Sequence, residues 1–306
     1  MGNKETEWLG KLKEKYEQTG QEINTYLEGL YHARPITYWD YIETETLLSL
    51  QKPRTYFPDE LVFIIYHQIT ELFLKLIEHE IDQLTGDAQP GIDQFKEKLP
   101  RIKRYAELLV DSFDVMRVGM SFEQYNQFRT TLTPASGFQS VAFRRIELKC
   151  TRIINLINDE GKKNLSTNPD INELFDNLYW WDAGRDKKTG KKTLTLQLFE
   201  KKYITGLKQL AQEIKGKTLE EKILNLKGPE DDLKQIYEMA RVFDLKYNVE
   251  WPKAHLKTAE YFLEGPQGTK AATGGSDWKR YLHPKYQKRK FFPSLWSKKE
   301  LDNWGE

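Results

Sequence analysis

Two side chains, those of His67 and Arg129, are candidates for contact with a bound ligand. His67 lies in the most apolar stretch of the chain, four residues after Phe63, so the two share one face of a predicted helix. Such a histidine either is satisfied by a neighbour in the core or faces a ligand. Arg129 follows Tyr125 by four residues and directly follows Phe128. A buried guanidinium requires an anion, which is either a glutamate of the chain or a ligand.

A third candidate lies near the C-terminal end. His255 follows Trp251 by one helical turn, a pattern that suits a packed haem-ligand face and equally suits ordinary packing. The small, glycine-rich segment 268–276 can present backbone N–H groups and hydroxyls to an anion, or it is a surface loop. It lacks the Gly-Lys-[Ser/Thr] ending of a phosphate-binding loop.

The remaining residues with reactive or metal-binding side chains exclude several kinds of site. None of the five histidines forms the His-x-x-His or His-x-x-x-His pair that a helical zinc site uses. The chain has one cysteine, Cys150, so an internal disulfide, a cysteine-cluster metal site and covalent c-type haem attachment are excluded. Any haem would therefore be held non-covalently.

The composition is that of a globular protein. Of 306 residues, 39% are hydrophobic and 13% aromatic, which is enough to form a sizeable core. The net charge of +1 argues against nucleic acid as a partner. The longest apolar run, 61–66, is far shorter than the roughly 20 residues of a membrane span, and the N-terminus has no secretory signal. We expect a soluble cytoplasmic protein with no membrane partner.

These side chains must be positioned by helices, because the hydrophobic period is helical almost throughout. We predict an all-α fold in a single domain, 1–306, with residues 1–35 as a helical arm in intersubunit contacts. Helices are predicted over 38–50, 58–84, 100–118, 137–157, 194–214 and 251–263. Capping boxes at Ser121 and Thr218 predict two more helices, the first of which should stop near Pro134, and Pro229 opens another. The polar stretch 186–192 suggests a hairpin tip.

Three blocks, in order along the chain, carry a resemblance to a known family. They are Tyr38-Trp39-Asp40-Tyr41-Ile42 with 59–72, then Phe128-Arg129 with 134–140, then 251–258 with Thr273-Gly274-Gly275-Ser276. Together they resemble the tryptophan 2,3-dioxygenase family. The resemblance implies an all-helical, homotetrameric haem b enzyme. Such an enzyme inserts O2 across the indole C2–C3 bond of L-tryptophan and yields N-formylkynurenine, the first step of the kynurenine route.

Carried over residue by residue, the resemblance assigns a role to each candidate. His255 would be the proximal ligand of the haem iron, with Trp251, Ser136 and Gly137 beside the haem. His67 would face the indole N–H, and its role would be to position the substrate rather than to act as an obligatory base.

The resemblance also implies a substrate pocket. Arg129 would bind the substrate carboxylate, and Thr273 would help to hold the ammonium and carboxylate groups. The indole would be surrounded by Phe63, Tyr125, Leu132, Tyr38, Tyr41 and Ile42. In this family the N-terminal segment of one subunit covers a neighbour's pocket, so Tyr38 and Tyr41 would act in trans.

Two alternatives stay open on the sequence. The first is a related histidine-ligated haem monooxygenase that acts on another indole or aromatic amino acid. The second is a non-catalytic haem-binding scaffold or sensor that retains the same framework. Formation of N-formylkynurenine would separate the dioxygenase from both.

Overall fold

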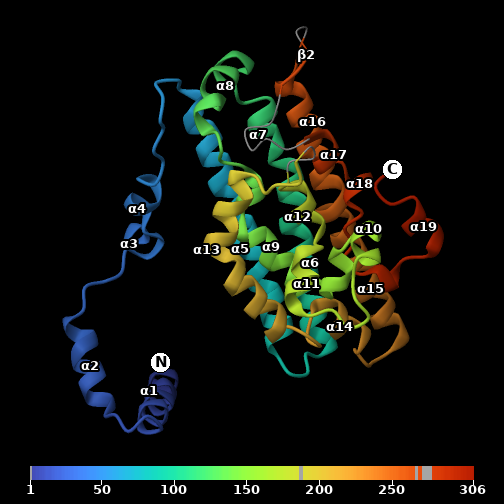
Figure 1. The fold of residues 1–306 in the computed structure, drawn as a ribbon. Coiled ribbons are helices and arrows are strands. Elements are labelled where there is room, and N and C mark those ends of the chain that lie inside the picture. Colours follow the sequence, from blue (N-terminus) through green and yellow to red (C-terminus); the bar gives the residue numbers. More distant parts are fainter. Residues whose placement is uncertain (1, 186–188, 266–267, 271–277) are drawn as a thin grey trace. The chain divides into compact units, whose positions relative to one another are not determined.

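The computed structural model (Figure 1) describes residues 2–185, 189–265, 268–270 and 278–306. The chain divides into two compact units, Met1–Gln51 and Lys52–Glu306. In the described part, the only named strands are the two-residue β1 (Glu264–Gly265) and β2 (Gly268–Thr269), which pair antiparallel. The predicted all-α class is therefore confirmed. That residues 1–306 form one domain with an arm at 1–35 stays a prediction.

The first unit contains four short helices: α1 (Gly2–Glu17), α2 (Ile23–His32), α3 (Tyr38–Ile42) and α4 (Thr44–Leu48). The rings of Tyr16 and Tyr26 stack at 3.8 Å and join α1 to α2. Glu43, with φ of 57°, divides the helix that we predicted over 38–50. No side chain described within 4–51 is buried, and Leu30, Tyr41 and Leu48 are each more than 70% exposed.

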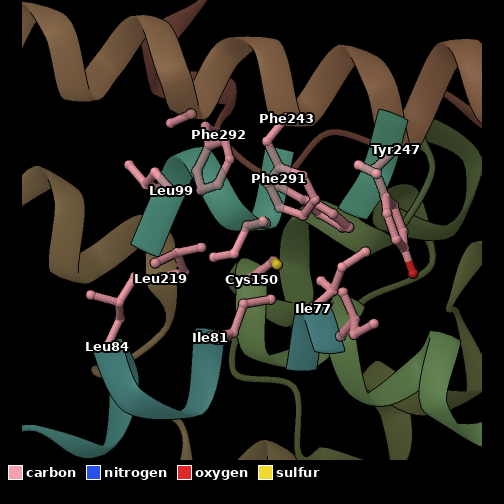
Figure 2. Packing of buried hydrophobic residues seen from close by; sticks show 14 of the residues in the cluster. Ile77, Ile81, Leu84, Leu99, Cys150, Leu219, Phe243, Tyr247, Phe291 and Phe292 are labelled. Carbon is pink, nitrogen blue, oxygen red and sulfur yellow. The ribbon is translucent and has the colours of Figure 1, made fainter. Parts of the chain in front are cut away.

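The second unit is built on four helices: α5 (Asp59–Gly86), α6 (Ile92–Asp111), α9 (Val141–Cys150) and α15 (Glu230–Leu245). Helix α6 packs against α5 and α15, and α5 also packs against α9. Figure 2 shows the core between them, in which Ile77 and Ile81 lie with Cys150 and with the aromatic side chains of Phe243 and Phe291. Each large apolar side chain buried in this way contributes about 1.5–3 kcal/mol.

The other helices surround this core or connect its parts. In chain order they are α7 (Phe113–Arg117), α8 (Phe122–Phe128), η1 (Arg129–Leu132), η2 (Gly137–Gln139), η3 (Ile153–Leu156), α10 (Asp159–Lys163), α11 (Ile171–Asp176), α12 (Tyr179–Ala183), α13 (Leu194–Glu213), α14 (Leu219–Leu224), the π-helical η4 (Lys246–Glu250), α16 (Trp251–Leu263), α17 (Trp278–Leu282), α18 (Pro284–Gln287), η5 (Pro293–Leu295) and α19 (Lys298–Asp302). None of the described helices has both the length and the hydropathy that crossing a bilayer requires.

Most predicted helices are confirmed, including those over 58–84, 194–214 and 251–263 and the three that begin after Ser121, Thr218 and Pro229. The helical turns that follow Ser121 end at Leu132, just before Pro134. Arg185 and Lys192 form an isolated antiparallel bridge around the predicted hairpin tip, part of which lies outside the described residues.

Two further predicted helices, both in the second unit, have the wrong bounds. Helix α6 begins at Ile92 rather than Pro100, because the Gln94 side chain accepts a hydrogen bond from the Gly91 N–H at 2.9 Å and caps an earlier start. The continuous helix predicted over 137–157 is divided into η2, α9 and η3. Helix α9 ends before Thr151, whose hydroxyl donates to the Glu220 carboxylate at 2.8 Å.

The segment 288–296 is held against α15 by one buried carboxylate. Asp244 is fully buried and accepts hydrogen bonds from the backbone N–H groups of Phe291 (2.9 Å) and Phe292 (3.2 Å). It also accepts from the indole N–H of Trp296 at 3.0 Å and from the Asn248 amide at 2.8 Å. Burial raises the pKa of this carboxyl group. Asp244 therefore fixes the path of the C-terminal segment by satisfying its buried donors.

We expect Asp244→Ala to lower the free energy of unfolding by about 3 kcal/mol or more, because several buried donors lose their acceptor. Denaturant unfolding of the wild-type protein and the variant measures this difference. Asp302→Ala, which removes an exposed carboxylate from α19, is the control and should stay within about 0.5 kcal/mol of wild type. Equal stability of the two variants would contradict the assigned role.

Candidate functional site

A pocket lies in the second unit, among α5, α7, α8, α9, α16 and the C-terminal segment. Its cavity volume is about 250 Å³, and most of its lining is apolar or aromatic. The structure brings most of the predicted site residues to this pocket: Phe63, His67, Tyr125, Arg129, Ser136, Gly137, Trp251 and His255.

His67 faces the pocket from the middle of α5, a 28-residue helix anchored in the core. Its Nδ1 lies 2.7 Å from the carbonyl oxygen of Phe63. Because a carbonyl oxygen only accepts, Nδ1 carries the proton, and Nε2 is left with a free lone pair in the neutral ring. Burial lowers the pKa of His67. The imidazole is therefore uncharged near pH 7 and can accept a hydrogen bond at Nε2.

His255 faces the same pocket from α16. Burial, and secondarily the proximity of His67, lower its pKa to about 4. Its ring stacks on that of Phe113 at 5.3 Å, with 23° between the planes. Within the described part of the chain, its two nitrogens make no hydrogen bond. A neutral imidazole with an available lone pair is the form that binds a metal ion.

Aromatic rings connect the two histidines and form the wall between them. The Tyr66 ring lies 5.2 Å from His67 and 5.4 Å from Phe113, which stacks on His255. On the other side, the rings of Phe63 and His67 are 4.1 Å apart, and Tyr125 lies 6.1 Å from Phe63. Offset and edge contacts of this kind suit a flat aromatic ligand.

Arg129 reaches the pocket from the junction of α8 and η1. It is 8% exposed, and its guanidinium lies 6.0 Å from the Tyr125 ring. Burial raises the pKa of Tyr125, so the phenol stays neutral beside this cation. The start of α8 is fixed to α5, because the Asp59 carboxylate accepts from the Ser121 N–H at 2.5 Å. The arginine is therefore held at a defined place relative to His67.

Three further pocket residues could lie against a bound cofactor. The indole N–H of Trp251 is buried and has no hydrogen-bond partner among the described residues. Gly137 borders open space, since a Cβ added there would meet no atom within 4 Å. The Ser136 hydroxyl accepts a hydrogen bond from the Phe138 N–H at 3.3 Å, which fixes the turn that carries both residues.

The remaining predicted residues lie elsewhere. Leu132 packs against the aromatic cluster that includes Phe63 and Tyr125, but it does not line the pocket. Tyr38, Tyr41 and Ile42 lie on α3 in the first unit, and their part in the pocket stays a prediction. Thr273 lies outside the described residues.

The sequence reasoning missed several residues of the pocket. Phe113 carries no local signal that would place it beside a histidine. Arg144 gives a signal, because an arginine and a glutamate three residues apart, Arg144 and Glu147, can pair on one face of a helix. Arg289 belongs to a basic, aromatic stretch whose place in the fold only the structure reveals.

Fold and pocket together define an all-α protein with a buried aromatic site. Two uncharged imidazoles and an arginine line this site. Residues 30–226 match the model of the tryptophan 2,3-dioxygenase family. The chain belongs to this family.

Curated proteins named tryptophan 2,3-dioxygenase are similar over most of the chain. The protein from Ruegeria sp. (strain TM1040) is 29% identical over 87% of this chain and 92% of its own length. The protein from Herpetosiphon aurantiacus is 28% identical over 87% of this chain and 98% of its own length. The protein from Anaeromyxobacter dehalogenans is 28% identical, with 87% of this chain and 96% of its own length aligned.

Proposed function

We propose that this protein is a haem-dependent dioxygenase that converts L-tryptophan and O2 to N-formylkynurenine, the first step of tryptophan catabolism by the kynurenine route. One observation carries the proposal: two neutral imidazoles and a buried arginine line a single aromatic pocket. Membership of the family and the names of the curated relatives support it. In the net reaction both oxygen atoms enter the product as the C2–C3 bond breaks, so no external reductant is consumed.

The cofactor proposed is haem b, held without a covalent bond. His255 would be its protein ligand, and Trp251, Ser136 and Gly137 would contact it. The free lone pair of a neutral imidazole and the largely apolar, aromatic lining of the pocket agree with this assignment. Haem, when bound, supplies the ferrous iron to which O2 binds. The single thiol, Cys150, is buried in the core (Figure 2), where burial raises its pKa, so it is no candidate for the ligand.

The substrate is a zwitterion with a flat aromatic body, and the residues of the chain match both parts. Arg129 would pair with the carboxylate through two parallel hydrogen bonds, which fixes direction as well as charge. Phe63 and Tyr125 would contact the indole ring. The free Nε2 of His67 would accept a hydrogen bond from the indole N–H. The contact of Thr273 with the ammonium and carboxylate groups stays a prediction.

The direct test supplies haem to the purified protein, reduces the iron and adds L-tryptophan and O2. We expect N-formylkynurenine to form with one O2 consumed per tryptophan. A haem-loaded protein that instead hydroxylates an aromatic substrate and consumes reductant would be a monooxygenase. A haem-loaded protein with no turnover would be a scaffold or sensor. Either result would contradict the proposed function.

We expect His67→Phe to reduce the preference for L-tryptophan over 1-methyltryptophan by about 2- to 12-fold, the worth of one neutral hydrogen bond. The variant keeps a ring in place but cannot accept from the indole N–H. Affinities can be measured from the spectral change on substrate binding. His79→Ala, which changes an exposed histidine on the same helix, is the control. If His67→Phe prefers L-tryptophan over 1-methyltryptophan as strongly as wild type does, His67 does not accept a hydrogen bond from the indole N–H.

The pH dependence of substrate binding follows from the same hydrogen bond. Protonation turns Nε2 from an acceptor into a donor, and burial lowers the pKa of His67 below its usual 6.5. The affinity for L-tryptophan should therefore persist as the pH falls through 6.5 and should decline only below it. Titrating substrate into the protein at a series of pH values measures this; a decline centred above 6.5 would contradict it.

We further propose a cytoplasmic homotetramer in which the first unit reaches a neighbouring subunit, with Tyr38 and Tyr41 acting in trans and Ile42 beside them. The exposed apolar side chains of α1 to α4 support this, because a helix with no buried face needs a surface to cover it. Removing residues 1–35 should lower the number of subunits per particle, which light scattering measures in solution. A full-length protein that is a monomer would contradict the proposal.

A further inference from the structure

One wall of the pocket carries a buried cluster of charged residues that the proposed reaction does not use. We call Arg144 of α9 and Arg289 of the C-terminal segment, with Glu147, the cationic wall. The two arginines are 2% and 3% exposed, Glu147 is fully buried, and both arginines line the pocket. Arg144 and Arg289 come from distant parts of the sequence, so the fold itself assembles this pair.

The single carboxylate in the cluster already accepts three hydrogen bonds. Glu147 accepts from Nη1 of Arg144 at 3.1 Å and from Nη1 of Arg289 at 2.8 Å, and it also accepts from the Tyr179 hydroxyl. Burial raises the pKa of Tyr179, so this phenol is neutral and provides no second negative charge. The cluster therefore contains two guanidinium charges against one carboxylate.

The two arginines also have unused donors. A guanidinium has five N–H groups. Arg144 donates to Glu147, to Tyr179 at 2.6 Å and to Tyr281 at 2.8 Å, while its Nε is buried with no partner among the described residues. Arg289 donates through Nε to Gln287 at 2.9 Å and through Nη1 to Glu147, and within the described part of the chain its Nη2 donates to nothing. A buried excess cation with free donors requires an anion.

The cationic wall is linked to the candidate iron ligand through aromatic contacts. The guanidinium carbons of Arg144 and Arg289 lie 4.9 Å and 4.7 Å from the centre of the Phe143 ring. Phe143 is in turn 5.2 Å from Trp251, one helical turn before His255. The cations therefore lie close to the helix that carries His255.

We propose that the cationic wall binds the propionate carboxylates of the haem, with Arg289 as the main contact because its Nη2 is free. This inference rests on the proposed function, since it concerns the same cofactor. Haem b is flat and apolar except for the two carboxylates on one edge, which lose their hydration in a buried site. Paired guanidinium groups satisfy carboxylates with directional, charge-assisted hydrogen bonds.

The test compares two cofactors on the same apoprotein: haem b and its dimethyl ester, which has the same iron and ring but no carboxylate charge. We expect wild-type protein to bind haem b at least about 10-fold more tightly than the ester. Arg289→Gln should weaken haem b binding about 10-fold or more and leave ester binding unchanged. The absorption spectrum of the bound haem should not change, since His255 remains its ligand. The matched control is Arg145→Gln, which removes a half-exposed cation from the same helix as Arg144.

The outcomes separate this inference from the proposed function. Wild-type protein that binds neither cofactor would overturn both. Wild-type protein that binds haem b and the ester equally would overturn the cationic wall as the propionate site and leave the proposed function standing. Equal weakening of both cofactors by Arg289→Gln would mean a purely structural role and would also overturn it. If Arg289→Gln does not fold, the affinities of the wild-type protein for haem b and for the ester decide whether the cationic wall binds the propionates.

Discussion

His255→Ala is expected to abolish stable haem binding, or to leave an iron that water ligates in place of imidazole. In the proposed site His255 would supply the bond between the protein and the haem iron, and no residue hydrogen-bonded to His255 in the described part of the chain could take its place. Removing a group that only hydrogen-bonds to a metal ligand costs roughly 10–100-fold in metal affinity, so loss of the ligand itself should cost more. Titration of apoprotein with haem, followed by absorption spectroscopy, measures the difference.

Two controls separate ligation from folding in this experiment. His79→Ala removes an exposed histidine and should retain the wild-type haem spectrum. Added imidazole should restore the spectrum of His255→Ala, because the free base can occupy the position of the lost side chain. If His255→Ala binds haem with an unchanged spectrum, another residue is the ligand and the proposed site is wrong.

The second large effect is expected from Arg129→Ala. Removing one partner of a desolvated charge pair costs about 2–5 kcal/mol, which corresponds to a decrease of about 30-fold to several thousand-fold in kcat/KM for L-tryptophan. The haem spectrum should not change, because Arg129 lies on η1 and His255 on α16. Steady-state kinetics with haem-loaded protein measure the effect.

A substrate analogue sharpens this second test. Tryptamine has the indole and the ammonium group but no carboxylate, so its affinity should be the same for wild type and Arg129→Ala. Arg117→Ala, which removes an arginine paired with Asp114 on α7, is the control. If Arg129→Ala weakens tryptamine as much as tryptophan, the arginine supports the pocket structurally and does not bind the carboxylate.

Local signals predicted the elements whose ends are encoded in a few neighbouring residues. The helical residues Trp251–Leu263 of α16 could be predicted from Pro252 and from the period of the apolar face, although the π-helical η4 joins α16 to α15 without a break. Pro100 does not begin a helix, because it lies inside α6, where the buried side chains of Phe95 and Leu99 stabilise the turn before it.

The residues of the candidate site could be predicted only from the three sequence blocks and their order along the chain. His67, Arg129 and His255 line one pocket, yet their spacing in the sequence alone allowed ordinary packing for each. The stacking of Phe113 on His255 and the pairing of Arg289 with Glu147 depend on tertiary contacts between distant segments. No local pattern encodes such contacts.

The anchoring of segment 288–296 by Asp244 has a consequence for biosynthesis. The segment places Phe291 and Phe292 in the core and Arg289 on the pocket wall, although α5, which carries His67, is translated far earlier. A ribosome-bound chain that has not yet been translated as far as Phe292 lacks part of the core, and its pocket wall is incomplete. We therefore expect cofactor capture to follow translation, and any nascent chain released before that point to be a substrate for proteases rather than a partly active product.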